Sequence, residues 1–472
     1  MSLTLAQALR VEESNCIAFV GSGGKTTALF QLARQLKPPV IVTATSHLGV
    51  WQVPFADKHI VAKSQNNLAT LEKDLNGVVL VTGDTKDDKF QPVHHEVIAS
   101  LRAFCTNHSI SLLIEADGSR QKPLKGWAEH EPPIPDFVDH VITVVGLSGL
   151  GKSLTEEHVH RPEIFAELSG LKAGEIIDSN AVTHVLSHDK SSLKNTPSRA
   201  RRTVLLNQAD APELQAAARA MTKRLLSKYY SVVIASLDQG KIYAAHEPVA
   251  GVILAAGESS RYGEPKQLLD WKGEPFVRVV AKRALEAGLS PVTVVTGANA
   301  EQVESAVKDL DVNIVRNNEW ESGQASSIRA GVIALKQPPP PFGHLPQIRQ
   351  GMLPDNQNFY VGFGGGWEGV GGVIFLLVDQ PQITTSILQA LVEKHAEGLY
   401  PIVAPMVMDR RANPVLFDRR TFADLLTLEG DTGGRAIFHK HKVEYLPWHD
   451  DRLLLDVDTP EHYQRMLADD TL

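Results

Sequence analysis

Residues 250–269 constrain the fold of this 472-residue chain more than any other stretch. They begin as a short apolar strand and continue into a loop in which Gly257 and Gly263 free backbone amides to face anionic oxygens. Arg261 and Lys266 add two positive charges at the far end of this loop. The pattern predicts a strand and loop that bind phosphate. The alternative is an ordinary connection between strand and helix with two solvated cations.

The residues that follow have the periodicity of an α/β domain. Helical patterns over 276–287 and 300–308 alternate with strand patterns over 292–296 and 313–316. Such alternation predicts a doubly wound sheet, in which ligands gather at the carboxyl ends of the strands.

A second helix start carries small polar residues. Gly323, Ser326 and Ser327 are suited to contacts with a nucleoside, and simple capping of the helix is the alternative. Residues 337–372 contain runs of proline and glycine, which predict a flexible surface insertion.

Carboxylates follow two apolar runs in the second half. Residues 373–378 form the most apolar run, read as a central strand, and deliver Asp379 to the edge of the sheet. Asp456 and Asp458 follow the run 453–455, also read as a strand. Carboxylate oxygens are preferred ligands of Mg²⁺, so we expect a magnesium site here, with ordinary acidic strand ends as the alternative.

These motifs together resemble the nucleotidyltransferases that act on molybdenum cofactor, over residues 249–468. The resemblance implies a Rossmann-like domain that binds CTP and molybdopterin with Mg²⁺ and releases pyrophosphate. It implies that Arg261, Lys266 and Asp379 are catalytic, and that Asp458 is preferred to Asp456 as the second metal ligand. A nucleotidyltransferase for a sugar or polyol phosphate, and a nucleotide-gated chaperone that inserts cofactor, remain as alternatives.

The resemblance also assigns binding residues. On the nucleotide side it implies Leu254, Ala255, Ala256, Gly257, Ser259, Gly263, Gly297, Gly323, Ser326 and Ser327. On the pterin side it implies Asn413, Pro414, Gly430 and Asp431. The resemblance places Ala256 at a position where the related guanylyltransferases have glycine. We expect the methyl group of Ala256 to narrow the wall of the site and so to favour a pyrimidine base.

The first half contains another strand, glycine loop and helix. An apolar run over 16–20 leads into Gly21, Gly23 and Gly24, and a helical pattern begins at Lys25. Amides at the helix N-terminus would hold phosphates, Lys25 would neutralise them, and the hydroxyl of Thr26 would reach Mg²⁺. We therefore predict a P-loop-like domain that binds ATP or GTP, with a tight structural turn as the alternative.

Residues 146–153 match the usual phosphate-loop spacing letter for letter. The residues after Lys152 have weak apolar periodicity and an early proline, so they do not predict the helix that such a loop requires. Loop 21–24 is therefore the better phosphate site.

Three further groups of polar residues are candidates in the first half. Asp117 follows an apolar strand and could hold Mg²⁺ beside the phosphate loop. The run 207–210, Asn-Gln-Ala-Asp, is typical either of a guanine-binding carboxylate or of an Asx turn. His158 and His160 invite a zinc interpretation, but no third ligand is identifiable and a structural role is favoured.

Several blocks over residues 1–235 together resemble the YqeC-like family associated with selenium-dependent molybdenum hydroxylases. These blocks are 21–27, 115–126, 129–135, 146–152, 160–163 and 207–210. The resemblance implies a second nucleotide and an apo molybdenum hydroxylase as a recipient partner.

Composition bounds these interpretations. A length of 472 residues favours at least two domains, which we place at 1–240 and 246–472. The net charge of −8 argues against broad binding to nucleic acid or to anionic membranes, and no stretch has the ~18 apolar residues of a membrane span. Only two cysteines occur, which excludes a disulfide framework and favours the reducing cytoplasm.

Overall fold

The computed structural model describes residues 3–11, 15–64, 75–259, 262–336 and 369–469. The chain forms two compact units, Met1–His246 and Glu247–Leu472. The expected insertion at 337–372 lies almost wholly outside the described residues, which resume at 369.

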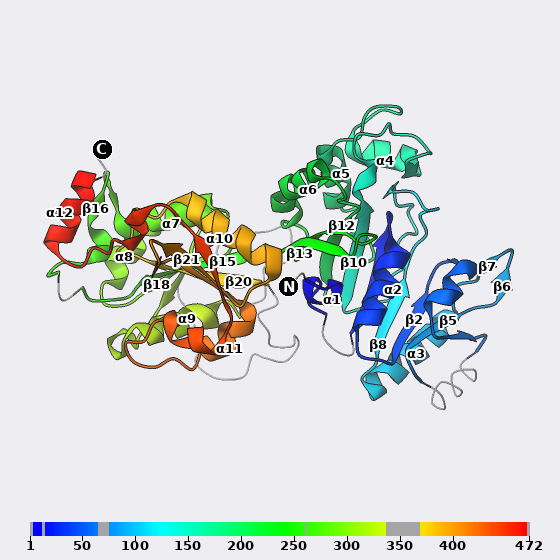
Figure 1. Ribbon diagram of the computed structural model, residues 1–472, viewed down its shortest axis with the longest axis horizontal. Helices are drawn as coiled ribbons and strands as arrows, with labels where there is room; N and C mark the ends of the chain where they lie inside the picture. Colours follow the sequence, from blue (N-terminus) through cyan, green and yellow to red (C-terminus); the bar gives the residue numbers. More distant parts are fainter. Residues whose placement is uncertain (1–2, 12–14, 65–74, 260–261, 337–368, 470–472) are drawn as a thin grey trace. The chain divides into compact units, whose positions relative to one another are not determined.

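The first unit is built on a nine-stranded sheet (Figure 1). Its strands, in spatial order, are β14 (Lys241–His246), β13 (Ser231–Ser236), β12 (Arg201–Asn207), β10 (His140–Gly146), β1 (Cys16–Gly21), β8 (Ser111–Glu115), β2 (Val40–Ala44), β5 (Val78–Thr82) and β4 (Lys58–Val61). All neighbours pair in parallel except β13 and β14, which are antiparallel. Because β14 completes this sheet, the first unit extends past the boundary at 240 that we expected.

Helices connect these strands. They are α1 (Leu5–Ala8), α2 (Lys25–Gln35), α3 (His95–His108), α4 (Pro162–Ser169), α5 (Ser179–Ser187) and α6 (Pro212–Leu225). Strand β1 is buried along its whole length, and its Cys16, Ala18 and Val20 share a cluster with Leu101 and Cys105 of α3. Helix α2 packs on β1, β8 and β2. A buried parallel strand of this kind reads as a continuous apolar run, which is why the sequence located it.

A two-stranded and a three-stranded sheet accompany the main sheet of the first unit. They are β9 (Leu124–Lys125) with β11 (Val159–His160), and β3 (Leu48–Gly49) with β7 (Lys89–Phe90) and β6 (Thr85–Lys86). The first pair brings residues 122–125 against the loop that follows β1.

The second unit contains an eight-stranded mixed sheet. Its order is β19 (Asn313–Arg316), β18 (Val292–Thr296), β15 (Val249–Ala255), β20 (Gly372–Leu377), β23 (Val415–Asp418), β21 (Ile402–Val407) and β22 (Arg410–Arg411), with β24 (Val443–Pro447) beside β21. Strands β19, β18, β15 and β20 are parallel, whereas β23 is antiparallel to both of its neighbours. The carboxyl ends of β15 and β20 therefore meet at one edge, where we look for a site.

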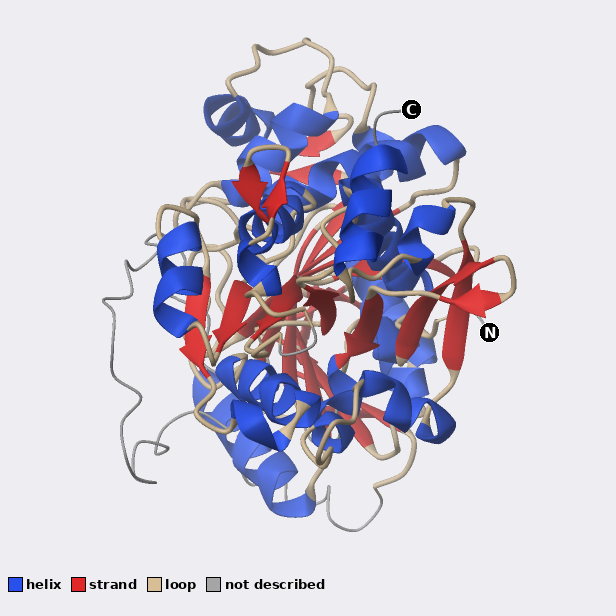
Figure 2. Ribbon diagram, turned by 90° about the vertical axis from the view of Figure 1, so that its left-hand side faces the viewer, coloured by secondary structure: helices blue, strands red, loops and turns tan. Residues whose placement is uncertain are grey.

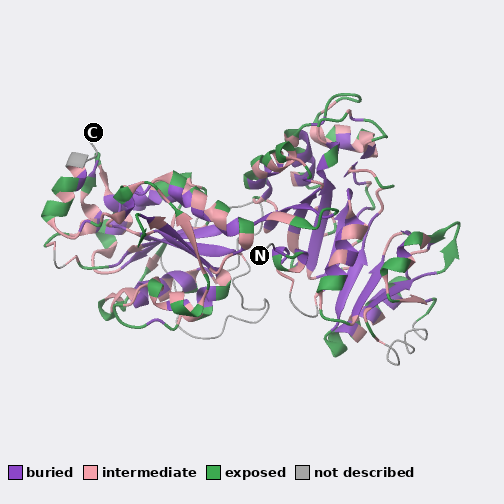
Figure 3. Ribbon diagram, viewed as in Figure 1, coloured by how far each residue is buried: buried purple, intermediate pink, exposed green. Residues whose placement is uncertain are grey.

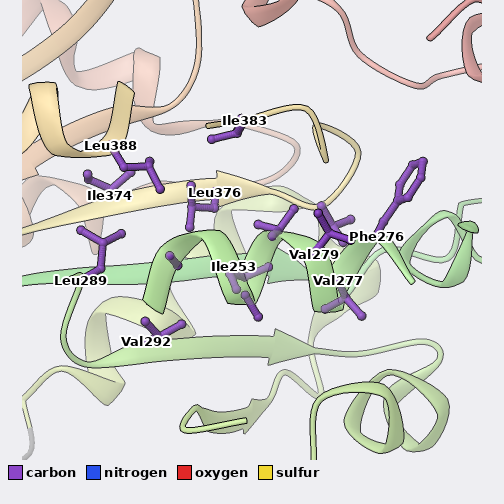
Figure 4. Close-up of a cluster of buried hydrophobic side chains, with 14 of the residues drawn as sticks. Ile253, Phe276, Val277, Val279, Leu289, Val292, Ile374, Leu376, Ile383 and Leu388 are labelled. Carbon is purple, nitrogen blue, oxygen red and sulfur yellow. The ribbon is translucent and has the colours of Figure 1, made fainter. Parts of the chain in front are cut away.

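Helices cover both faces of this second sheet. They are α7 (Phe276–Glu286), α8 (Ala300–Val307), α9 (Gln324–Ala334), α10 (Thr385–Gly398), α11 (Phe422–Leu425) and α12 (Pro460–Asp469). Ile253 of β15 joins one buried cluster with α7 and α10 (Figure 4). Val252 joins another cluster, with α9. Successive side chains of a strand point to opposite faces, so the two clusters confirm an α/β layering. Helices and strands alternate along the chain as the sequence indicates, and the strands form the buried layers (Figures 2 and 3).

One sequence expectation about local structure is wrong. Residues 453–455, read as a strand, lie mostly in a 3₁₀ turn, Asp451–Leu454. The side chain of Asp450 accepts a hydrogen bond from the backbone N–H of Arg452 and so caps that turn. The cap by Asp450 therefore favours a turn at these apolar residues, where we expected a strand.

Candidate functional site

The loop after β15 is held in shape by Gln267. This side chain is 1% exposed and donates hydrogen bonds to the carbonyl oxygens of Ala255 (3.2 Å) and Gly257 (2.5 Å). Ser259 Oγ accepts from the backbone N–H of Lys266 at 3.1 Å. These contacts fold the loop back on the strand end and fix the start of the Lys266 side chain. Sequence reasoning gave Gln267 no role, because its partners are backbone groups.

Lys266 lies between two carboxylates that come from distant segments. Its Nζ is 2.9 Å from Asp458 Oδ1 and 4.0 Å from Asp379 Oδ2. The backbone N–H of Val457 donates to the carbonyl oxygen of Asp379 at 3.2 Å, which joins the acidic segment to the end of β20. Asp456 accepts from Gln380 Nε2 at 2.5 Å. The structure thus gathers Lys266, Asp379 and Asp458, whereas Arg261 lies outside the described residues.

The electrostatics of Asp379 suit a cation. Burial, with Asp456 and Asp458 nearby, raises the pKa of Asp379 to about 6. Burial also raises the pKa of Asp456. The Asp379 Oδ1 atom is buried and has no hydrogen-bond partner among the described residues. An oxygen left in this state is the donor that a hard cation such as Mg²⁺ prefers.

The protein does not supply a complete metal cage by itself. Within the described ranges, no group of three or more His, Cys, Asp or Glu side chains is placed to hold a metal ion. A metal bound by Asp379 and Asp458 would therefore take its remaining ligands from substrate phosphates and water, as Mg²⁺ commonly does.

The N-terminus of α9 packs against a turn from a distant segment. The backbone N–H of Ala325 donates to the Gly430 carbonyl oxygen at 3.1 Å, and a Cβ on Gly323 would lie only 2.4 Å from the Gly430 carbonyl carbon. Asp431 Oδ1 lies 3.5 Å from the N–H of Gln324. The expected nucleotide and pterin residues Gly323, Gly430 and Asp431 are thus adjacent.

The two serines of α9 face inward. Asn317 Nδ2 donates to the hydroxyls of Ser326 (2.7 Å) and Ser327 (3.0 Å), and both serines are buried. These bonds anchor α9 to the end of β19. Asn317, which sequence reasoning missed, is the residue that positions this helix.

Ala256 does not form the wall that we expected. Its side chain is 3% exposed and belongs to a buried cluster with Val252 and Val295. A Cβ on Gly297 would lie 2.5 Å from the Ala256 carbonyl oxygen, and the N–H of Ala298 donates to that oxygen at 3.0 Å. The methyl group of Ala256 therefore faces the core, and direct shape selection of the base by this methyl is not supported.

Arg435 joins the expected pterin wall to the acidic segment. Its guanidinium lies 3.4 Å from Asn413 Oδ1 and acts to lower the pKa of Asp456 against the effect of burial. Pro414 is buried at the start of β23. Arg435 is exposed, and sequence reasoning did not single it out, because two preceding glycines are the only distinctive residues beside it.

In the first unit, the loop between β1 and α2 requires glycine. Gly21, Gly23 and Gly24 have φ of 97°, 75° and 115°, which other residues rarely adopt. A Cβ on Gly21 would lie 2.2 Å from the Val144 carbonyl oxygen. Strand β10 therefore approaches the loop at a distance that only glycine permits.

Asp117 stabilises this loop. Its carboxylate accepts the N–H of Gly21 at 3.0 Å, Lys125 Nζ at 2.9 Å and Trp127 Nε1 at 3.0 Å. Lys25 Nζ lies 3.4 Å away. We expected Asp117 to hold Mg²⁺, but its oxygens are already used by two ammonium groups and by the backbone.

Glu115 is the carboxylate that faces the threonine of α2. Its Oε2 accepts from the Thr26 hydroxyl at 3.1 Å, and burial raises its pKa. From the sequence we expected Glu115 at the end of this strand, but we assigned the metal to Asp117, the next acidic residue along the chain. The contact with Thr26 is long range, so spacing alone could not choose between the two.

The first turn of α2 follows directly on this glycine loop. The amides of Ser22 and Gly23 donate to the carbonyl oxygens of Val144 (2.8 Å) and Lys122 (3.1 Å). The first amides of a helix have no partner within it and carry the positive end of its dipole. Lys25 Nζ donates to the Gly21 carbonyl oxygen at 2.6 Å, so its charge lies beside this turn.

A cavity of about 570 Å³ borders the same turn. Thr26 and Thr27 line it from α2, and Trp51, Pro54 and Phe55 line it from the following 3₁₀ helix, Val50–Phe55. Apolar and aromatic side chains therefore border the first turn of α2 on this side.

The structure also places the other candidates of the first half. Residues 146–153 form a short 3₁₀ turn, Leu147–Gly149, and no helix begins at Lys152. Asn207 Nδ2 donates to the Gly23 carbonyl oxygen at 2.8 Å. Burial and the charges of Arg161 and Lys125 lower the pKa of His160 to about 4, which disfavours the charged ring.

Comparisons with known proteins agree with this division. Residues 17–163 match the family described as YqeC protein, and residues 251–445 match the MobA-like NTP transferase domain. No helix among the described residues is long and apolar enough to cross a membrane.

Three relatives illustrate the two halves. "Uncharacterized protein YqeC" of Escherichia coli is 33% identical over 41% of this chain and 75% of its own length. "Nicotine blue oxidoreductase" of Paenarthrobacter nicotinovorans is 29% identical over 46% of this chain and 96% of its own length. "Probable molybdenum cofactor guanylyltransferase" of Bacillus mycoides is 38% identical over 12% of this chain and 30% of its own length.

Proposed function

Since this chain belongs to the YqeC family through its first half and carries a MobA-like NTP transferase domain in its second, we propose that it matures molybdenum cofactor with two nucleotide sites. The second unit transfers CMP from CTP to molybdopterin and releases pyrophosphate. The first unit binds ATP or GTP at the turn that begins α2, and an apo molybdenum hydroxylase receives the product.

The geometry around Asp379 carries the proposal for the second unit. A carboxylate with one buried, unpartnered oxygen lies 4.0 Å from Lys266 Nζ, at the edge where β15 and β20 end. Mg²⁺ held by Asp379 and Asp458 would neutralise phosphate charge and orient the reacting oxygens. Lys266 binds and orients the leaving phosphates, because its ammonium group is a fixed positive charge where negative charge develops.

The remaining residues position the substrates. Gln267 holds the loop that presents Lys266, so the phosphates meet a preorganised site. Arg435 and Asn413 lie on the side of Asp456, where their donors can orient the phosphate of the pterin. No protein nucleophile is required, because the terminal phosphate of the pterin attacks the α-phosphate directly and pyrophosphate departs with its electron pair.

An oxidoreductase activity is the second candidate, because a relative with that printed name matches over 96% of its length. The group around Asp379 favours phosphoryl chemistry, since a hydride transfer has no need of paired carboxylates beside a lysine.

Pyrophosphate release by the full chain tests the proposal. CTP, GTP and UTP are each offered with Mg²⁺ and either molybdopterin, a sugar phosphate or a polyol phosphate. We expect release with CTP and molybdopterin, and loss of release in Asp379→Asn. Equal rates of pyrophosphate release with CTP and GTP would overturn the preference for CTP and leave a general nucleotidyltransferase. Release with a sugar phosphate but not with molybdopterin would overturn the assignment to molybdenum cofactor. Exposed Asp409→Asn, in the turn after β21, is the matched control.

Nucleotide binding by the first unit is tested separately. Lys25→Ala should weaken one class of nucleotide sites without changing pyrophosphate release, because Lys25 belongs to the first unit. If Lys25→Ala leaves all nucleotide binding unchanged, α2 does not bind phosphate.

A further inference from the structure

The strand order of the first unit places residues 207–210 beside the phosphate loop. Strands β1, β10, β12 and β13 are consecutive in the sheet and parallel, so their carboxyl ends share one edge. Parallel strands lie about 4.8 Å apart, which puts the end of β12 about 10 Å from the end of β1. A nucleotide with its phosphates at α2 can extend its ribose and base along this edge.

Asn207 ties three segments together at that edge. The side chain is 2% exposed and donates to the Gly23 carbonyl oxygen at 2.8 Å. Its Oδ1 accepts the N–H of Leu237, which follows β13, at 3.0 Å. Gln31 of α2 donates to the Leu237 carbonyl oxygen at 2.9 Å. Asn207 is therefore a positioning residue that fixes the distance between the phosphate loop and the turns after β12 and β13.

Asp210 is presented at the same edge. Ser236 Oγ donates a hydrogen bond to Asp210 Oδ1, and the N–H of Ala209 donates to the Ala235 carbonyl oxygen at 3.0 Å. Asp210 is exposed despite these restraints. A carboxylate that is held by a neighbouring strand and still open to solvent is prepared to accept hydrogen bonds from a ligand.

We infer that Asp210 recognises guanine, so that the first unit selects guanine nucleotides over adenine nucleotides. Guanine presents two donors on one edge, N1–H and the exocyclic N2 amine, which match the two oxygens of a carboxylate. Adenine presents a lone pair at N1 and a C–H at C2, so it would oppose the carboxylate. This inference rests on the proposed nucleotide site at α2 and names the base that the site accepts.

The Asx-turn alternative does not account for the arrangement. An Asx turn uses the side chain of residue 207 on the backbone two residues on. Asn207 instead bonds to Gly23 and Leu237, which lie far from it in sequence. The contacts join the loop after β1 to the turn after β13, which a local turn does not do.

Calorimetric titration of the full chain with GDP, ADP and XDP, in the presence of Mg²⁺, tests the inference. We assign to the first unit only the nucleotide binding that Lys25→Ala removes, because on our proposal the second unit also binds nucleotide. We expect GDP to bind at least about a hundredfold more tightly than ADP, since a site built for polar donors rejects an analogue without them. Equal affinities would overturn guanine recognition and leave the phosphate site in place. Absence of any Lys25-dependent binding would overturn both.

Asp210→Asn separates base contact from damage to the fold. An asparagine can accept N1–H and donate to the C2 carbonyl oxygen of xanthine, but it meets the N2 amine of guanine with another donor. We expect the variant to lose at least about tenfold in GDP affinity and to gain at least about tenfold in XDP affinity. Loss of GDP binding without gain of XDP binding would overturn the base contact. Asp189→Asn, an exposed carboxylate that bonds to Lys228 at 3.3 Å, is the control and should keep the GDP preference.

Discussion

Asp379→Asn should stabilise the metal-free protein while it abolishes transfer. The pKa of Asp379 is raised from 3.8 to about 6, and the shift comes mainly from burial and then from Asp456 and Asp458. A shift of about two pKa units corresponds to about 3 kcal/mol of differential interaction. The side chain is 24% exposed, so solvent screening removes only part of this energy.

The sign of the pH dependence follows from linkage. Between about pH 4 and pH 6 the folded state binds more protons at Asp379 than the unfolded state does, so stability falls as pH rises through this window. Above pH 7 the folded state carries the full cost of the buried charge. Asparagine removes that cost and also removes the attraction of Lys266, 4.0 Å away, so we expect a net gain of about 1–3 kcal/mol at pH 8.

Hydrogen exchange on the full chain provides the assay. Peptides from β20 report the free energy of opening of the second unit, and a chelator keeps the sample free of metal. The variant should be more protected than the parent at pH 8, and the difference should vanish below pH 4. Transfer should fall by about 10²–10³ in kcat, as expected for one lost electrostatic stabiliser. A variant that is less stable at pH 8, or that keeps a tenth of its activity, would refute the reasoning.

Three other changes test the two loops. Gln267→Ala should raise KM for CTP by about tenfold, because two loop carbonyl oxygens lose their donor; steady-state kinetics that show an unchanged KM would contradict this. Gly297→Ala should destabilise the second unit by about 1–3 kcal/mol, because the new Cβ would lie 2.5 Å from the Ala256 carbonyl oxygen. Gly257→Ala is the control, since a Cβ there meets no atom within 4 Å. Thermal unfolding compares the two variants, and equal losses of stability would count against the packing argument. Lys25→Glu should abolish Lys25-dependent nucleotide binding in equilibrium dialysis, because a carboxylate would repel phosphate; retained binding would place the site elsewhere.

The sequence predicted the local parts of both loops well. The first combines an apolar strand, glycines and a helical pattern within about 20 residues, and the structure confirms β1 (Cys16–Gly21) and α2 (Lys25–Gln35). The second combines an apolar strand with a glycine loop, and the structure confirms the strand as β15 (Val249–Ala255). The helix expected at 276–287 is observed at Phe276–Glu286. These signals depend on neighbours in sequence, so one chain is enough to read them.

The partners of polar side chains could not be predicted in the same way. Asp117 meets Lys125 and the amide of Gly21 only because β8 lies next to β1, and Asn207 reaches Gly23 only because β10 separates β12 from β1 by a single strand. Strand order is a long-range property that periodicity does not contain. The direction of the Ala256 methyl could not be predicted for a related reason. Ala256 lies just after β15, and its methyl packs in a cluster with Val295 and Ala325, residues that are distant in sequence.

Each of the two proposed phosphate sites has a lysine that is held by a carboxylate. Lys25 Nζ lies 3.4 Å from Asp117, and Lys266 Nζ lies 2.9 Å from Asp458, although the two loops have different lengths and spacings. A lysine held by a carboxylate has already lost most of its rotamer freedom, which otherwise costs binding about 0.5–1.5 kcal/mol per ordered side chain. The two carboxylates differ in their burial and in their other partners. Asp117 keeps a buried bond to Lys125 and stays with the loop. Asp458 is half exposed, so we expect it to exchange the lysine for a metal ion when nucleotide enters. On the proposed function, we therefore expect the first loop to hold a phosphate and the second to let one react.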